Sequence, residues 1–350
     1  MIVAHLDLDA FFAAVEMHEH PELRDVPLVV GGDPHGRGVV ATANYHARKF
    51  GIGSAMSCAE ALRRCPHAVF VRPRGAVYRE YSRAVWETVR TIVPSVERTG
   101  LDEGYLDLGT VAGDFREARQ VADAVRVAVR GATSLSCSIG VGTSKVVAKI
   151  ASDRRKPGGL TVVPPGREAA FLAPFPIRLL PGIGPRTEER LRAGGIETLG
   201  ELAALPDATL AQVLPGKTGP VLRDRARGVD PRTVEPPAAA VSLGHEETFE
   251  RDVGDPERLH DEVRRMAERV AAELAASHRA ARTITTKVRY PDFAIRSRST
   301  TLAVGTDDPA LIAQLACSLL DRALRDRPGP LRLVGVTASN FEPYRQLALA

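Results

Sequence analysis

The sequence predicts a multidomain α+β protein, and three observations support this fold class. The chain has 350 residues, more than one ordinary domain holds. Between residues 1 and 165, strand-like and helix-like patterns follow one another in a split β-α-β-β-α-β order, with an insertion after the first strand. A segment with three prolines and no periodicity, residues 229–240, then precedes a second, smaller α+β unit.

The first half is expected to form a sheet with covering helices. Residues 1–8 alternate as a strand, and residues 10–20 have helical spacing that stops at Pro21. Short strands at 26–32 and 37–41 enclose a glycine-rich turn, and the lack of a Gly-Lys-Ser/Thr sequence favours a hairpin over a phosphate loop. The other expected elements are helices at 43–50, 57–64, 77–92, 114–130 and 143–152, a hairpin at 95–108, and strands at 135–142 and 160–163.

The second half is expected to begin with short helices and to end in the smaller α+β unit. Residues 166–233 are interrupted by Pro and Gly at intervals that allow only short helices. Beyond the linker, the pattern predicts strands at 241–249, 283–290, 295–302 and 331–338, and helices at 256–277 and 308–326.

Composition narrows the functional classes. The hydrophobic fraction of 44% and the charged fraction of 26% are those of a soluble globular protein. The formal net charge of +4 is compatible with a nucleic-acid partner without being diagnostic of one. Four cysteines lack the spacing of a disulfide scaffold or a zinc site, and no segment reads as a signal peptide or membrane span. We therefore expect a cytoplasmic protein.

Three acidic residues lie in otherwise apolar, strand-like segments. Asp7 ends the first strand, and Asp102 and Glu103 occupy the turn-like centre of RTGLDEGYLDL. Converging buried carboxylates need compensation, and oxygen-only ligand sets suit Mg²⁺ or Mn²⁺. Two such ions, about 3.5–4 Å apart, can activate a hydroxyl and stabilise a leaving pyrophosphate. Taken alone, Asp7 is equally compatible with an ordinary solvated charge.

Two lysines raise a related question. Lys145 and Lys149 share one helix face at i, i+4, so they repel each other unless an anion faces them. That anion is either a DNA backbone or an acidic neighbour, and the sequence does not choose between them.

Four segments occur in a characteristic order: HLDLDAFFAAVE, ATANYHARKFGIGSAM, GLDEGYLDLG and SCSIGVGTSKVVAKIASDRRKPGGL. Together they resemble the Y-family DNA polymerases, most closely the bacterial DNA polymerase IV type. The resemblance extends from residue 1 to about residue 345 and implies a right-hand polymerase fold. It assigns the ferredoxin-like palm to 1–9 and 75–165, small fingers to 10–74, a helix-hairpin-helix thumb to 166–233, a linker to 234–240 and a little finger to 241–345.

The resemblance implies a template-directed DNA polymerase that adds dNTPs to a primer 3′-hydroxyl by two-metal nucleotidyl transfer. Low fidelity, translesion synthesis and the absence of proofreading are implied with it. Small residues where the base pair would lie also predict a roomy pocket: Ala41, Ala43, Ser54 and Ala55. The alternatives are a palm-fold nucleotide cyclase, which needs no grip on a duplex, and a non-catalytic protein that binds damaged DNA on the same fold.

By this resemblance the metal ligands are Asp7, Asp102, Glu103 and the backbone carbonyl of Leu8. The cofactor is expected to be two Mg²⁺ ions, for which Mn²⁺ can substitute. Asp9 and Asp107 are interpreted as structural acids.

The consecutive rings of Phe11 and Phe12 point about 100° apart at a helix start, so they cannot serve the same surface. Phe11 is expected to pack in the core, whereas the resemblance makes Phe12 the steric gate against a 2′-hydroxyl. Tyr45 and Arg48 lie at i, i+3 and share one helix face. The full implied nucleotide-binding set is Phe11, Phe12, Thr42, Tyr45, Arg48 and Lys156.

Two segments are expected to hold DNA. Residues 180–196 resemble a helix-hairpin-helix whose glycines expose backbone N–H groups to phosphate. Residues 278–300 concentrate cations, and Lys287 and Arg289 alternate with Val288 and Tyr290, which predicts one basic and one apolar face. The implied DNA-binding set is Gly182, Gly184, Lys287, Arg289, Arg296 and Arg298.

The expected partners are primer–template DNA and dNTP, bound by a monomer at the bacterial nucleoid. The C-terminal sequence also resembles a peptide that docks on the sliding clamp. Gln346, Leu347 and Leu349 match that peptide, but Ala350 replaces its aromatic anchor, which predicts weaker binding.

Overall fold

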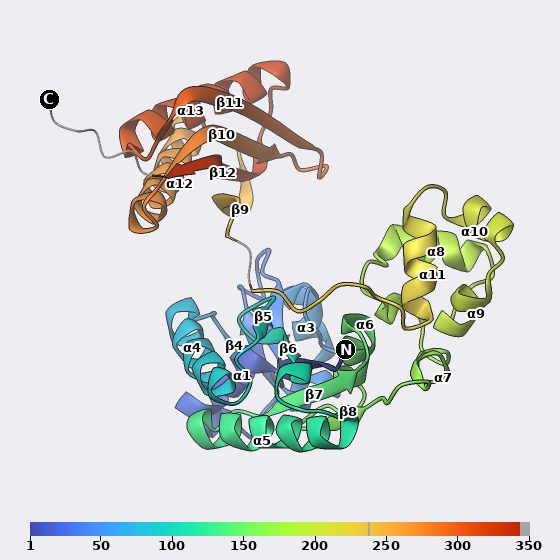
Figure 1. The fold of residues 1–350 in the computed structure, drawn as a ribbon. Helices are drawn as coiled ribbons and strands as arrows, with labels where there is room; N and C mark the ends of the chain where they lie inside the picture. Colours follow the sequence, from blue (N-terminus) through green and yellow to red (C-terminus); the bar gives the residue numbers. More distant parts are fainter. Residues whose placement is uncertain (237–238, 344–350) are drawn as a thin grey trace, which may run out of the picture. The chain divides into compact units, whose positions relative to one another are not determined.

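The computed structural model describes residues 1–236 and 239–343. The chain divides into two compact units, Met1–Ala238 and Ala239–Ala350 (Figure 1). The first unit contains a five-stranded sheet, a three-stranded sheet and a group of short helices, and the second contains a four-stranded sheet with two helices. The expected clamp-docking residues 346–350 lie outside the described residues.

The five-stranded sheet has the order β5-β6-β1-β7-β8. Its strands are β1 (Val3–Leu8), β5 (Val96–Arg98), β6 (Glu103–Asp107), β7 (Cys137–Gly142) and β8 (Leu160–Val162). The central strand β1 is antiparallel to both β6 and β7, and β8 is parallel to β7. Helix α4 (Gly75–Ile92) connects β1 to β5, and helix α5 (Phe115–Thr133) connects β6 to β7, which confirms the expected split β-α-β-β-α-β order.

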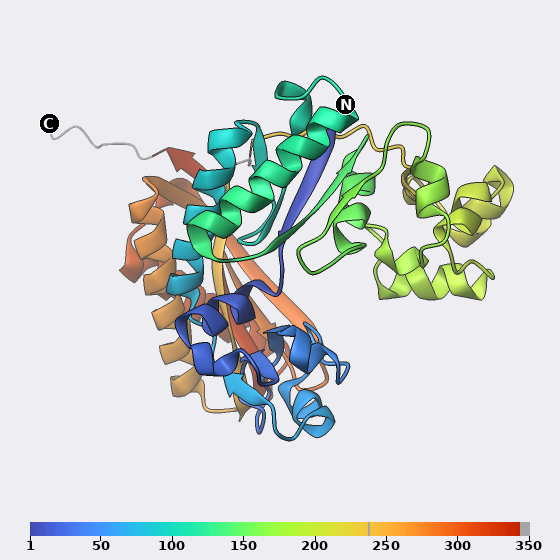
Figure 2. The same ribbon diagram turned by 90° about the horizontal axis from the view of Figure 1, so that it is seen from below.

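Helices cover both faces of this sheet. One face buries Ala4, Leu6 and Leu8 of β1 against α4 and α5, with Trp86 fully buried among them. Figure 2 shows α5 lying across this face. The other face carries the odd-numbered residues of β1 and is covered by α6 (Lys145–Asp153). The side chains of His5 and Asp7 therefore lie on the α6 face.

The insertion after β1 forms its own small sheet. It begins with α1 (Phe11–Glu19) and a 3₁₀ turn at Pro21–Leu23, followed by β2 (Leu28–Gly31), β3 (Val40–Ala43), α2 (Tyr45–Arg48), α3 (Cys58–Arg64) and β4 (Val69–Val71). Strands β2 and β3 form the expected antiparallel pair, but β4, which is parallel to β2, was not expected. A Cβ on Gly38 would lie 2.5 Å from backbone atoms of residues 32 and 33, so the turn requires glycine there.

A 3₁₀ turn at Leu108–Thr110 lies between β6 and α5. After β8 the chain forms short helices, as expected. They are α7 (Glu168–Leu172), a 3₁₀ turn at Ile177–Leu179, α8 (Pro185–Ala193), α9 (Leu199–Ala204), α10 (Asp207–Val213) and α11 (Thr218–Ala226). A capping box of Thr198 and Glu201 starts α9. The chain then returns to the first sheet, where Ser144 Oγ donates to the Gly228 carbonyl and the Glu235 N–H donates to Glu97, both at 2.8 Å.

The second unit is an antiparallel sheet of order β11-β10-β12-β9 with both helices on one face. Its elements are β9 (Ser242–Val253), α12 (Pro256–Ala276), β10 (Arg279–Arg289), β11 (Ile295–Thr306), α13 (Pro309–Asp326) and β12 (Leu331–Pro343). Ile284 and Val288 of β10 are buried beneath the helices, so the alternate residues of that strand face away from them. None of the helices in residues 1–236 and 239–343 combines the length and apolar character of a membrane span.

Candidate active site

The sheet brings three acidic residues together at the level of the backbone. Asp7 at the end of β1 is the register partner of Glu103 in β6. The N–H of Leu8 donates to the carbonyl of Asp102 at 2.9 Å, which fixes the turn before β6 against the end of β1. Residues distant in sequence therefore become neighbours because β1 and β6 pair along their length.

Asp7 and Asp102 line one cavity of about 200 Å³. Burial raises the pKa of Asp7 above its ordinary value, although Lys156 opposes this effect. Burial likewise raises the pKa of Asp102, and the nearby charge of Glu103 adds to the effect. The Nζ atom of Lys156 lies 2.8 Å from Asp7 Oδ2 and 2.8 Å from Asp153 Oδ1. Asp7 and Asp102 thus face the same cavity, and Lys156 lies between Asp7 and Asp153.

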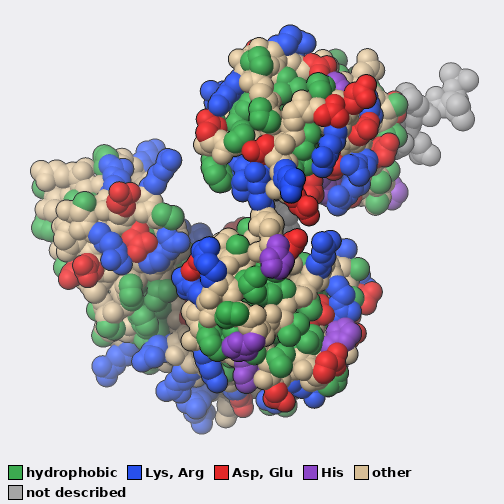
Figure 3. All heavy atoms as spheres, turned by 180° about the vertical axis from the view of Figure 1, so that it is seen from behind, with side chains coloured by type: hydrophobic (Ala, Val, Ile, Leu, Met, Phe, Trp, Pro, Cys, Tyr) green, Lys and Arg blue, Asp and Glu red, His purple; other side chains and the backbone are tan. Residues whose placement is uncertain are grey.

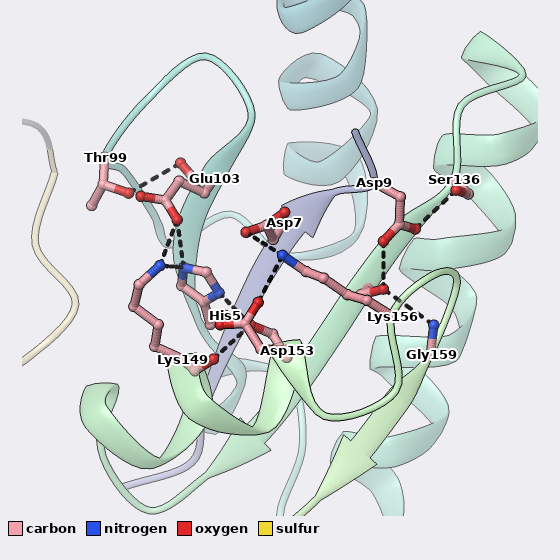
Figure 4. A network of polar contacts seen from close by, with 12 residues as sticks. His5, Asp7, Asp9, Thr99, Glu103, Ser136, Lys149, Asp153, Lys156 and Gly159 are labelled. Carbon is pink, nitrogen blue, oxygen red and sulfur yellow. Dashed lines mark hydrogen bonds and ion pairs between the residues drawn. The ribbon is translucent and has the colours of Figure 1, made fainter. Parts of the chain in front are cut away.

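The side chain of Glu103 turns the other way, toward α6. Its Oε2 atom lies 2.6 Å from Lys149 Nζ and 3.5 Å from His5 Nε2 (Figure 4). The hydrogen bond with His5 and the charge of Lys149 lower the pKa of Glu103 to about 2, against the opposite effect of burial. The ring of His5 is itself held by Ser152 Oγ at 2.8 Å.

The expected meeting of three carboxylates is therefore incomplete in this conformation. Among residues 1–236 and 239–343, no three His, Cys, Asp or Glu side chains are grouped closely enough to hold a metal ion. The structure brings Asp7 and Asp102 to the cavity and leaves Glu103 paired with Lys149. It also answers the question about the lysines for this conformation, since Lys145 contacts Glu97 and Lys149 contacts Glu103.

The other two acids in these segments have structural contacts, as interpreted from the sequence. Asp9 is 3% exposed and accepts hydrogen bonds from the hydroxyls of Ser136 and Ser138 and from the N–H of Gly158, each at 2.8 Å. Asp107 accepts from the N–H of Gly109 at 3.0 Å and caps the following 3₁₀ turn. Both carboxylates are used to fix the backbone.

The two consecutive rings differ in burial, as expected, but both line the same cavity, and their centroids lie 5.4 Å apart. Phe11 is 2% exposed and belongs to the core, although it also borders the cavity, whereas Phe12 is half-buried and lines it. The ring of Phe12 stacks on Tyr78, with centroids 4.2 Å apart and planes 12° apart. Ala10, just before α1, adopts a left-handed conformation with φ 49°, which turns the chain sharply from β1 into the helix.

A buried polar group that sequence reasoning missed supports this stack. The hydroxyl of Tyr78 donates to Glu16 Oε1 at 2.6 Å, and Arg74 donates to both oxygens of the same carboxylate at 2.9 and 2.7 Å. Glu16 is 2% exposed. Burial and this hydrogen bond raise the pKa of Tyr78. The available signal was an acid inside the apolar helix AFFAAVEM, where a buried carboxylate requires a partner.

Most of the expected nucleotide-binding residues share the cavity. Thr42, Arg48 and Lys156 line it together with Phe11 and Phe12. Tyr45 is not among the lining residues, but its ring lies beneath the Arg48 guanidinium at 4.9 Å. The buried hydroxyl of Tyr45 has no hydrogen-bond partner among the described residues, and burial raises its pKa to about 12. An unpaired buried donor beside an arginine is suited to an anionic ligand.

The expected glycine turn precedes α8. Gly182 has φ 104°, which disfavours any other residue, and Gly184 is the N-cap of α8. Both are exposed, and within the described residues neither N–H has a hydrogen-bond partner. The turn thus presents free donors at a helix N-terminus.

The basic residues of the second unit do not share one face. Lys287 and Arg289 lie opposite the helices, as predicted from their alternation with the buried Val288 and Tyr290. In β11, however, Arg296 pairs with Val288, and Arg298 pairs with Thr286. Directly paired residues point to the same side of a sheet, so these two arginines lie on the helix side. There Arg298 Nε donates to Asp326 at 2.8 Å, while on the open face Lys287 Nζ contacts Glu246 at 2.8 Å.

The chain matches three family profiles. The impB/mucB/samB family matches residues 6–153, and its C-terminal domain matches residues 240–349. A profile described as the DNA polymerase-iota thumb domain matches residues 178–230.

Curated relatives resemble the chain over nearly its whole length. A DNA polymerase IV of Streptomyces coelicolor is 43% identical over 98% of this chain and 72% of the relative. DNA polymerase IV of Dehalococcoides mccartyi is 40% identical over 99% of this chain and 89% of the relative, and that of Halorhodospira halophila is 42% identical over 98% and 96%.

Solved structures agree with these relatives. A chimaera of the Y-family DNA polymerases Dbh and Dpo4 superposes with a TM-score of 0.87 at 28% identity, covering 98% of this chain and 100% of the chimaera. An insertion ternary complex of Dbh DNA polymerase superposes with a TM-score of 0.69 at 27% identity, covering 98% of this chain and 100% of that one.

Proposed function

This chain belongs to the Y family of DNA polymerases and is a DNA-directed DNA polymerase of the translesion class, and we propose that it works by two-metal nucleotidyl transfer at Asp7, Asp102 and Glu103. The observation that carries the proposal is the cavity that Asp7 and Asp102 share with Arg48 and Lys156. It combines acids for cations with cations for phosphates. The relatives reported above are DNA polymerases, so they support neither a palm-fold cyclase nor a non-catalytic DNA-binding protein.

The chemistry of the donor set fits divalent cations. Carboxylate oxygens of Asp7 and Asp102 and the carbonyl of Leu8 are the oxygen ligands that Mg²⁺ prefers, and burial of both acids increases the demand for positive charge. Glu103 completes the set if its side chain turns from Lys149, since its backbone already lies opposite Asp7. Two bound Mg²⁺ ions, for which Mn²⁺ can substitute, would stabilise the attacking primer oxygen and the departing pyrophosphate.

The remaining cavity residues bind and orient the nucleotide in this proposal. Arg48, Lys156 and the unpaired hydroxyl of Tyr45 hold the triphosphate through charge-assisted hydrogen bonds. Phe12 supports the sugar from below and excludes a 2′-hydroxyl, because its ring is fixed against Tyr78. Thr42 lines the same cavity.

The template side of the cavity is assigned to small residues. Ala41 and Ser54 are exposed lining residues, and they leave space for a distorted base pair. We propose that this space permits bypass of damaged templates at the cost of fidelity. We propose that the chain has no proofreading activity, as its resemblance to the family implies.

The proposed domain boundaries follow the family plan. The palm comprises residues 1–9 and 75–165, the fingers 10–74, the thumb 166–233 and the little finger 241–345, with a linker at 234–240. The thumb would bind DNA phosphates through the free N–H groups of Gly182 and Gly184. The little finger would add Lys287 and Arg289 from its open face and Arg296 and Arg298 from its β11 edge. We further propose a monomer that acts at the bacterial nucleoid and docks weakly on the sliding clamp through residues 346–350.

Primer extension tests this proposal. Purified wild-type protein, Mg²⁺, dNTPs and an intact or lesion-bearing primer–template should give extended primers, and the double variant Asp102→Ala/Glu103→Ala should give none while still binding DNA. Binding without extension by the wild type would favour the non-catalytic alternative. Equal extension by the variant would remove these acids from the mechanism.

A further inference from the structure

In the first unit, a groove outside the candidate active site is lined by arginines from α5 and from the chain between α6 and β8. It has a volume of about 520 Å³ and lies between α5 and the chain that joins α6 to β8. Its cationic lining residues are Arg116, Arg119, Arg126 and Arg155, and its one lining acid among the described residues is Asp123. It shares no lining residue with the cavity of Asp7 and Asp102.

The spacing of the α5 arginines places them on one face. Arg116, Arg119 and Arg126 follow one another at intervals of three and seven residues, and both intervals are close to whole helical turns. The opposite face of α5, which includes Ala122 and Val125, is fully buried in the core. Because the core fixes the rotation of the helix, the arginine face is fixed toward the groove.

Within the described residues, most of this positive charge has no partner. Among the described residues, the side chains of Arg116, Arg119 and Arg155 form no hydrogen bond or ion pair. Arg126 contacts the Gly158 carbonyl and Asp123, the latter at 2.8 Å, yet its Nε is buried without a partner. The carboxylate of Asp123 is thus already paired with Arg126, and the positive charges of the other arginines remain uncompensated. An anionic ligand would remove this repulsion.

The groove and the catalytic cavity share no lining residue, although the adjacent residues Arg155 and Lys156 line one each. Helix α5 covers the sheet face that carries Leu6 and Leu8, whereas Asp7 lies on the face covered by α6. Figure 3 shows Lys and Arg side chains, with some Asp and Glu, along the lower edge of the first unit, where α5 lies in Figure 1.

We propose that this groove binds the phosphodiester backbone of DNA as a second contact outside the active site. Guanidinium groups match phosphate with paired hydrogen bonds, and none of the described residues that line the groove is an aromatic on which a base could stack. The contact is therefore to the backbone and independent of sequence. From residue 116 to residue 126, α5 rises by about 15 Å, which equals the rise of about four nucleotides of one strand. A DNA-directed polymerase supplies this ligand as its own substrate.

A charge-matched pair of variants of the full chain tests the proposal. Arg116→Glu/Arg119→Glu changes the groove, and Arg79→Glu/Arg83→Glu makes the same charge change at exposed positions of α4. Binding of a fluorescein-labelled primer–template is measured by anisotropy between 50 and 300 mM NaCl. We expect the groove variant to bind at least about tenfold more weakly than the α4 variant and to have a salt slope lower by about 1–2, since each lost phosphate contact removes about 0.9. Equal affinities and slopes for the two variants would overturn the proposal.

Arginine modification distinguishes the source of the anion in the wild-type protein. DNA should protect Arg116 and Arg119 from phenylglyoxal, read by mass spectrometry, and leave Arg79 and Arg83 reactive. Protection by pyrophosphate or polyglutamate, without protection by DNA at the same ionic strength, would assign the groove to a free phosphate or an acidic protein and refute the DNA contact. Primer extension by the wild type reports separately on the proposed catalytic function, so the two claims can fail independently.

Discussion

Replacing Phe12 by Ala should abolish most of the discrimination between deoxyribonucleotides and ribonucleotides. The ring lines the cavity and stacks on Tyr78 at 4.2 Å. Tyr78 in turn is fixed through Glu16, which Arg74 holds with two hydrogen bonds. In the proposed binding mode, a 2′-hydroxyl would be accommodated only if the Phe12 ring moved, and that movement would disturb this series of contacts.

The contacts of the Phe12 ring set the expected size of the effect. Displacing the ring costs about 0.5–1.5 kcal/mol for an unfavourable rotamer and about 0.5–1.5 kcal/mol for the aromatic stack. If Tyr78 also moves, its hydrogen bond to the charged Glu16 adds about 1.5–3 kcal/mol. Together these contributions amount to about 2.5–6 kcal/mol, which corresponds to about 10²- to 10⁴-fold in rate at 1.36 kcal/mol per tenfold. We expect Phe12→Ala to lose selectivity by a factor in this range.

The assay is single-turnover insertion of dCTP and rCTP opposite a template guanine, with the ratio of the two efficiencies as the result. Tyr78→Phe is the graded control, because it keeps the stacked ring and removes only the hydroxyl bond to Glu16, so selectivity should fall by at most about 10- to 160-fold, less than in Phe12→Ala. Thermal unfolding verifies that both variants are folded. A Phe12→Ala variant whose selectivity stays within threefold of the wild type would refute the steric role.

Three other changes test neighbouring parts of the account. Asp9→Ala removes the acceptor of three hydrogen bonds at a buried position and should lower the free energy of unfolding by about 2–4 kcal/mol, measured by urea denaturation; a loss below 0.5 kcal/mol would contradict its structural role. Lys149→Met removes the charge that lies 2.6 Å from Glu103 and should lower the Mg²⁺ concentration for half-maximal extension about tenfold, whereas an unchanged or higher concentration would count against a ligand role for Glu103. Burial alone would raise the pKa of Asp230, but the effect of Arg232 is larger and lowers that pKa. The ion pair therefore stabilises the folded state above the ordinary aspartate pKa of about 3.9. This stabilisation is lost as the pH falls through the lower pKa that Asp230 has in the folded state. The unfolding free energy of the wild type should therefore exceed that of Asp230→Asn at pH 7 and approach it below pH 4; a difference independent of pH would argue against the ion pair.

Local patterns in the sequence predicted the elements of the fold well where one face is buried. The alternation in residues 1–8 and the helical spacing of residues 114–130 both correspond to real elements, because burial of one face fixes strand register and helix rotation. Strand β4, which has three exposed or half-buried residues, was missed. Its place beside β2 follows from tertiary pairing alone.

The sequence predicted which residues line the site better than it predicted how their side chains are oriented. The motif residues indicated that Asp7 and Asp102 would share a cavity with Arg48 and Lys156, and they do. The orientation of Glu103 depends on Lys149 and His5, whose positions are set by the packing of α6 on β1 and cannot be read from spacing. Likewise, the opposite faces of Lys287 and Arg298 follow from the register of β10 and β11, which the sequence pattern left undetermined.

The most direct test of the central claim counts the metal ions. A ternary complex of the protein, a dideoxy-terminated primer–template and the matching dNTP is titrated with Mn²⁺, and bound ions are measured by electron paramagnetic resonance. The account predicts two Mn²⁺ ions per wild-type complex and the loss of protein-dependent binding in Asp102→Ala/Glu103→Ala. The same stoichiometry and affinity in both proteins would contradict it.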